Sequence, residues 1–334
     1  MTSIEEIVAS ILNLTDDEFF GVDQSILAPR ESRLLDMDFF GIAVSAPSKI
    51  TTDRCDKLPL IMAARFSGER DWEVRLKENC ILVGTNLQDG TVHFSKAFVS
   101  EKEIRSRGRR QKLPKGPKPP GLALEAAQVV QLFPRSLFNI SWNTGIWALG
   151  VIYYDWASNS VVVELEGDAE MTFPPAPPVN PEPSLLGASG LPCFFPMDKM
   201  PQPPDSGVNF TGEFLVKEKR QILNIYGAFT VPVQPFHIPE KPLVHQFQDG
   251  RQENVGGIVP VTMAVVGLDW DEPLHFNWAV PVYGTPLATG MLARGCFAID
   301  VFDTGMMQEL AAGNYACYII LDGNTFGPKI LKVS

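Results

Sequence analysis

The sequence contains no run of about 20 apolar residues, the length that a helix needs to cross a lipid bilayer. Its first residues, Met1 to Glu6, lack a basic cluster followed by an apolar stretch, so no secretory signal is visible. Together these absences predict a soluble, cytoplasmic protein with no membrane partner.

The sequence also has fewer basic than acidic residues. The 334 residues include 28 lysines and arginines against 39 aspartates and glutamates, which gives a net charge of −11. Nucleic-acid-binding surfaces draw much of their affinity from basic side chains. The charge therefore disfavours nucleic acid and leaves a protein partner, or further copies of the chain in a homo-oligomer.

Signatures of catalysis are missing. There is no Gly-x-Ser-x-Gly, no phosphate-binding glycine loop and no His-Glu-x-x-His, and the chain has only four histidines. A catalytic site needs titratable groups that converge in a pocket. We therefore expect a non-catalytic protein and predict no cofactor.

The cysteines follow no regular spacing. Their number is odd and no Cys-x-x-Cys pair occurs, which favours reduced thiols over a disulfide framework. The five cysteines are Cys55, Cys80, Cys193, Cys296 and Cys317.

The first 37 residues read as a helical arm. Apolar residues in 3–14 recur at helical spacing, and Ser3 with Glu6 has the pattern of a capping box. Thr15 with Glu18 has the same pattern before a second short helix. Such an arm either docks on its own domain or packs on a partner chain.

Residues 38–172 read as a β-rich domain, either a sandwich or a jelly roll. Short apolar segments alternate with Gly, Pro, Asn and Asp, and Asp89-Gly90 is a hairpin signal. Residues 123–132 predict a short helix instead. The expected strands are 39–44, 60–66, 73–76, 80–84, 91–99, 137–142, 146–154 and 160–165.

A proline-rich linker is predicted at 173–205, where prolines recur too often for regular structure. A second β domain then occupies 206–334, beginning with alternating segments at 209–216 and 221–231. The fold class is therefore mainly β, with two β-rich domains and a short N-terminal helical segment.

Three landmarks stand in order within residues 255–334. An apolar strand covers 259–267, a tryptophan follows at Trp278, and Gly313-Asn-Tyr315-Ala-Cys317 places a tyrosine two residues before a cysteine. This stretch resembles the immunoglobulin-like β-sandwich superfamily, in which such residues mark strands B, C and F. The resemblance implies strand E at 296–302, strand G at 327–334, and a Tyr315 hydroxyl bonded to the chain upstream.

The resemblance departs from the superfamily at one point. The cysteine of strand B would fall near Val265, where none is present, so Cys317 would be a free buried thiol. Because this sandwich hosts many unrelated roles, the resemblance bears on fold alone.

Two sets of residues are candidate sites. Imidazole and carboxylate suit zinc or iron, so a metal site is possible at the junction of the β domains, although the spacing matches no known signature; its candidate ligands are His237, His245, His275 and Asp271. A basic stretch reads as an exposed loop that either grips anions or partners, or only balances an acidic body; its charged residues are Arg105, Arg107, Arg109, Arg110, Lys112, Lys115 and Lys118.

These features favour a structural, self-assembling or partner-binding β protein, such as a coat- or shell-like protein or an interaction module. The alternative is a tailoring enzyme on a β scaffold, possibly metal-assisted, with the histidines as its site.

Overall fold

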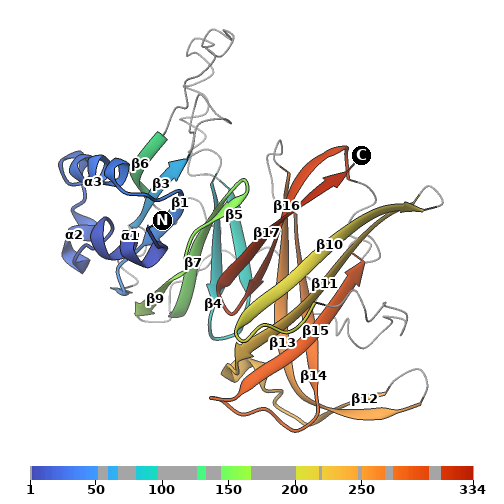
Figure 1. Cartoon of the computed structure of the whole chain (residues 1–334). Coiled ribbons are helices and arrows are strands. Elements are labelled where there is room, and N and C mark those ends of the chain that lie inside the picture. Colours follow the sequence, from blue (N-terminus) through green and yellow to red (C-terminus); the bar gives the residue numbers. More distant parts are fainter. Residues whose placement is uncertain are drawn as a thin grey trace, which may run out of the picture. The chain divides into compact units, whose positions relative to one another are not determined.

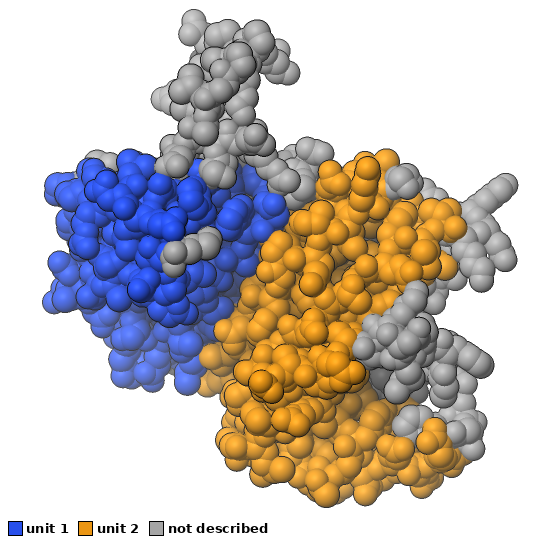
Figure 2. Space-filling model, in the orientation of Figure 1, with its two compact units in different colours: residues 1–84, 93–176 blue, residues 85–92, 177–334 orange. Residues whose placement is uncertain are grey.

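The computed structural model describes residues 2–51, 59–66, 80–96, 126–132, 144–166, 201–217, 220–246, 250–267, 274–300 and 310–333. The chain divides into two compact units, which Figure 2 colours separately. Unit 1 comprises residues 1–84 and 93–176, and unit 2 comprises residues 85–92 and 177–334. The division at 176/177 falls within the proline-rich segment of the sequence.

Unit 1 contains three helices followed by strands in two sheets (Figure 1). The smaller sheet has the order β1-β3-β6, and the larger has the order β2-β9-β7-β4-β5, with β8 paired to β7. The elements are α1 (Ile4–Ser10), α2 (Asp16–Phe20), α3 (Gln24–Asp36), β1 (Gly41–Ser45), β2 (Lys49–Thr51), β3 (Leu60–Phe66), β4 (Ile81–Asn86), β5 (Val92–Lys96), β6 (Ala126–Leu132), β7 (Gly145–Tyr153), β8 (Trp156–Ala157) and β9 (Val161–Glu166).

The first two helices begin where the sequence predicts. Ser3 caps α1 and Thr15 caps α2, each within a complete capping box. The Glu18 carboxylate accepts the Thr15 backbone N–H at 2.7 Å, and this bond lowers the pKa of Glu18. Both predicted capping boxes are confirmed.

The small sheet of unit 1 is the middle of three layers. Its side chains alternate between two cores because successive residues of a strand point to opposite faces. In β3, Met62 and Ala64 face the larger sheet, whereas Ile61 and Ala63 pack with Ile7 and other helical residues. The N-terminal segment is thus docked on its own unit, the first of the two interpretations.

Two elements of unit 1 differ from the sequence prediction. Residues 126–132 form strand β6, paired antiparallel with β3, so the short helix predicted at 123–132 is wrong. Pairing with the central strand β3 outweighs the high helix propensity of Ala126 and Ala127. Helix α3, which contains Pro29, lies within the predicted helical arm of residues 1–37, but its bounds were not predicted.

Unit 2 consists of two antiparallel sheets that share one core. One sheet has the order β10-β11-β15, and in the other β13 pairs with β12, β14 and β16, while β16 pairs with β17. The elements are β10 (Gly207–Lys217), β11 (Arg220–Pro232), the 3₁₀ turn η4 (Pro235–His237), β12 (Leu243–Gln246), β13 (Gln252–Gly267), β14 (Leu274–Tyr283), β15 (Leu292–Asp300), β16 (Gly313–Leu321) and β17 (Asn324–Val333).

The core of unit 2 lies between these sheets. Phe229 of β11 and Phe297 of β15 face Trp278 of β14 and Met263 of β13 across it. The sheets also run beside each other at both margins, β10 along β17 and β14 along β15. The mainly β class predicted from the sequence is confirmed, and both units have sandwich-like sheets.

Strand order in unit 2 can be compared with that of an immunoglobulin domain, which places strands B and C in different sheets. Here β13 and β14, at the positions of B and C, are neighbours in one sheet. Val265 also lies directly opposite Cys317 on the adjacent strand β16. A cysteine at position 265 would therefore face Cys317 within a sheet and not across the core.

Tyr315 makes the hydrogen bond to the upstream chain that the resemblance implies. The Tyr315 hydroxyl donates a hydrogen bond to the Ala311 carbonyl, four residues upstream, at 2.6 Å. Its ring is buried in the core of unit 2.

Among the described residues, no helix is long and apolar enough to cross a membrane.

Candidate functional site

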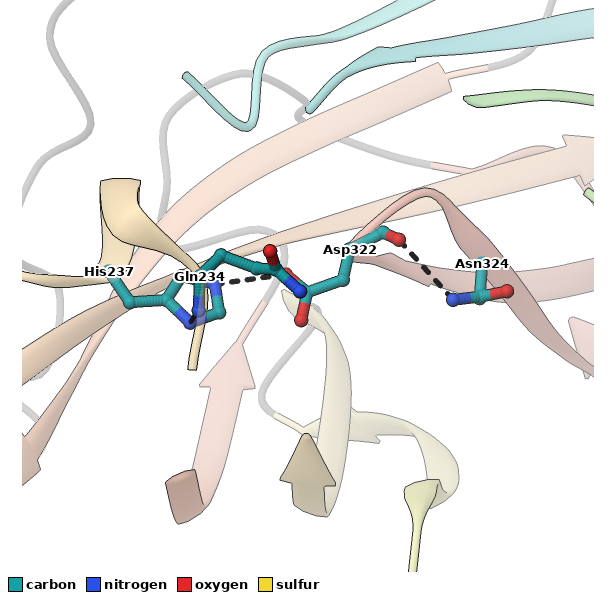
Figure 3. Close-up of polar contacts among 4 residues, drawn as sticks. All are labelled: Gln234, His237, Asp322 and Asn324. Atoms are coloured by element: carbon teal, nitrogen blue, oxygen red, sulfur yellow. Dashed lines mark hydrogen bonds and ion pairs between the residues drawn. The ribbon is translucent and has the colours of Figure 1, made fainter. Parts of the chain in front are cut away.

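A buried histidine side chain and a buried aspartate side chain are hydrogen-bonded to each other in unit 2 (Figure 3). His237 ends the turn η4, which connects β11 to β12 and begins with Pro235, a residue suited to the first position of a helical turn. Asp322 lies in the turn between β16 and β17, where it has a φ of 49° and Gly323 a φ of 76°. Segments 85 residues apart thus meet at one point.

Hydrogen bonds fix the tautomer of His237. Its Nδ1 accepts the backbone N–H of Gln234 at 3.1 Å, and its Nε2 lies 2.9 Å from Oδ1 of Asp322. Because Nδ1 is an acceptor, the imidazole proton is on Nε2 and is donated to the carboxylate. Both ring nitrogens are therefore engaged.

The surroundings of the pair hold it rigidly. The His237 side chain is fully buried, and the Phe236 ring meets it edge-on with the centroids 4.6 Å apart. The Asp322 carbonyl accepts a bond from the Asn324 side-chain amide at 3.3 Å. Oδ2 of Asp322 is buried and hydrogen-bonds to none of the residues that the structure describes.

This geometry is typical of a hydrogen bond that stabilises the fold, and it does not match a metal-binding or proton-transferring histidine. A histidine that binds a metal or moves a proton needs one ring nitrogen directed at the metal or substrate. Here one nitrogen is used by the backbone and the other by Asp322. The pair connects the β11–β12 segment to the β16–β17 turn.

The other two candidate ligand histidines lie near opposite ends of β13. His245 of β12 is paired with Glu253, and His275 of β14 is paired with Ala264. Eleven residues of strand separate these two positions, a distance of about 36 Å at ~3.3 Å per residue. His245 and His275 therefore cannot bind one metal ion.

Nor do other described side chains complete a metal site. Within the described ranges, no group of three His, Cys, Asp or Glu side chains is arranged to hold a metal ion. His245 instead packs edge-on against Tyr283, and burial lowers the pKa of His275. The fourth candidate ligand, Asp271, lies outside the described residues.

The basic residues that the sequence singles out as a candidate anion-binding or partner-binding site lie outside the described part of the chain. Residues 97–125 lie outside the described part of the chain. All seven predicted anion-binding or partner-binding residues, from Arg105 to Lys118, fall within that range.

Asp322 was missed by the sequence analysis. An Asp-Gly pair between two apolar segments is a recognisable hairpin turn. Nothing in the local pattern, however, shows that the turn folds back onto a histidine from another segment. That contact depends on the arrangement of the two sheets.

Comparison with known proteins adds little. No family model matches the sequence, and no relative was found among curated proteins. Among solved structures, a Corynebacterium diphtheriae protein named "putative membrane anchored protein" is similar at 8% identity and a TM-score of 0.15. The alignment covers 88% of this chain and 57% of that one, and a likeness at this level carries no argument.

Proposed function

We propose that this chain is a non-catalytic structural β protein that works through protein–protein contact, with further copies of itself as the first partner to test. The observation that carries the proposal is a set of aliphatic side chains on regular strands that remain more than half exposed to solvent. They are Val162, Val216, Val244, Leu292 and Ile330.

These residues occur in both units. Val162 lies on β9 in unit 1, diagonal to the exposed Ile146 of β7, whose cross-strand partner is Glu164. The other four lie on β10, β12, β15 and β17 of unit 2. Apolar side chains on a rigid sheet lose little conformational freedom on docking, which makes them favourable contact points.

Charge and thiol chemistry refine the proposal. A net charge of −11 favours protein partners over nucleic acid. Burial raises the pKa of the Cys317 thiol to about 12, and Cys80 and Cys317 are both free and buried. Free buried thiols are typical of a reducing compartment, so we place the protein in the cytoplasm.

The alternative of a metal-assisted enzyme gains no support from His237. That alternative needs a histidine nitrogen available to a metal, and the two nitrogens of His237 are engaged by Gln234 and Asp322.

Native mass spectrometry of the full chain over a micromolar concentration series, with elemental analysis of the same sample, tests the proposal. We expect discrete oligomers whose population grows with concentration, and no stoichiometric metal. A monomer at every concentration, carrying one zinc or iron per chain, would overturn it.

A further inference from the structure

Strand β12 and the start of β13 form a two-stranded ribbon at one end of unit 2 (Figure 1). Residues 243–246 of β12 pair with residues 252–255 of β13, and β14 joins β13 only from Val255 onward. Within the described residues, β12 pairs with no strand other than β13. The outer edge of β12 therefore offers backbone N–H and C=O groups to an additional strand.

One face of this ribbon is exposed and uncharged. Val244 lies opposite Asn254, and Gln246 lies opposite Gln252, so the four side chains share a face. All four are exposed, and Val244 is 58% exposed. In a chain of net charge −11, this face permits two copies to approach without direct repulsion between like charges.

The edge of β12 differs from the sheet edge formed by β2 in unit 1. At β2 in unit 1, Lys49 forms ion pairs with Glu164 and Glu166 of β9. Charged side chains of this kind protect sheet edges against pairing with another chain. Strand β12, with the sequence Leu-Val-His-Gln, carries no carboxylate, lysine or arginine.

We propose that β12 is the contact through which two copies of this chain pair, antiparallel and edge to edge, about a two-fold axis at Val244. The inference rests on the proposed self-assembly and names the surface that performs it. It would join the two ribbons into one four-stranded sheet.

The register follows from the alternation of side chains. Residues directly opposite each other in a sheet point to the same face, so a two-fold axis normal to the sheet must pair residues of the same parity. An axis at Val244 places it against Val244 of the second copy and Leu243 against His245 of the second copy. This register buries the most exposed apolar side chain of β12 against its own equivalent.

Further apolar side chains lie at the same end of unit 2. Ile238 follows η4 and leads into β12, and the exposed Leu292 pairs with Pro232, immediately before η4. Met291 is also exposed, and its carbonyl accepts the Val233 N–H. Their exposure adds apolar surface to this end of unit 2.

Sedimentation velocity of the full chain and of Val244→Lys tests the proposal. Two lysines facing each other across the axis repel, so we expect the dimer dissociation constant to rise about tenfold or more. The matched control is Leu35→Lys, because Leu35 is 45% exposed on helix α3 of unit 1, is not among the proposed contact residues and should leave the dimer unchanged. Circular dichroism verifies that both variants are folded.

A second variant covers the case in which Val244→Lys does not fold. In Val244→Cys, a short bismaleimide should cross-link two copies in high yield, whereas Leu35→Cys should cross-link no more than the wild type. If the wild type is oligomeric and neither Val244 variant differs from its Leu35 counterpart, the β12 contact is wrong while the proposed self-assembly stands. A wild type that is monomeric throughout overturns both.

Discussion

At the residue scale, His237 shows how burial changes what a histidine can do. An exposed imidazole offers one nitrogen to protons or metals, but each nitrogen of His237 has a partner inside the protein. We therefore expect the His237 side chain to contribute to the folding stability of unit 2.

Removing either member of the His237–Asp322 pair should destabilise unit 2. His237→Ala leaves a buried carboxylate and the Gln234 N–H without their partner, at an expected cost of about 2–4 kcal/mol in unfolding free energy. Asp322→Asn retains an acceptor for Nε2 and should cost less than half of that. Chemical denaturation measures both values.

The double variant provides the control. If the two side chains act together, the cost of His237→Ala falls when Asp322 is already alanine, with a coupling of about 1–3 kcal/mol. Strictly additive costs would show that the 2.9 Å contact contributes nothing of its own.

At the scale of elements, local capping explains where helices begin. Thr15 accepts the Glu18 N–H through its side chain and receives the Glu18 carboxylate on its own N–H, in front of a helix of five residues. So short a helix is not stable alone, and its cap and the buried Phe19 hold it in place.

Thr15→Ala removes the side-chain half of this box and should lower the free energy of unfolding by about 1 kcal/mol. Thr15→Ser keeps a capping hydroxyl and should stay within about 0.3 kcal/mol of the wild type. Urea denaturation followed by tryptophan fluorescence compares the two variants. Equal losses for alanine and serine would refute a capping role.

Two arginine side chains in unit 1 donate hydrogen bonds to backbone carbonyls at the C-terminal ends of helices. Arg30 of α3 donates to the Ile11 carbonyl at 2.6 Å, just beyond α1. The buried Arg65 of β3 donates to the Leu34 and Met37 carbonyls at the end of α3. Both satisfy carbonyl groups that a helix end leaves without intrahelical partners.

At the scale of the whole molecule, three of the four histidines lie in unit 2, and these three do not converge. His245 and His275 pair with residues at distant positions on β13, and His237 is bonded to Asp322. A metal ion would have to displace an internal hydrogen bond to reach His237.

Zinc and chelators should therefore leave the thermal stability unchanged. A ligand that binds the native state at a hundredfold excess over its dissociation constant stabilises it by about 2.7 kcal/mol, an easily measured shift in melting temperature. We expect no shift by differential scanning fluorimetry with equimolar zinc or with EDTA. A shift lost in His245→Ala or His275→Ala would contradict this expectation.

The sequence by itself determined the features that depend on neighbouring residues. Ser3 with Glu6 and Thr15 with Glu18 are capping boxes because their partners are three residues apart, and β3 spans the predicted residues 60–66. Tyr315 reaches Ala311 because that contact is also local. Alternation of apolar residues likewise identified β10, β11 and β17 of unit 2.

Only the tertiary structure decided which strands are neighbours and which distant side chains meet. Residues 126–132 became a strand because β3 offers them an edge, and β13 lies between β14 and β16 in one sheet. His237 found Asp322, and not the other histidines, because the packing of the two sheets brings η4 to the β16–β17 turn. Such contacts follow from the burial of whole sheet faces, a property that no local pattern of residues encodes.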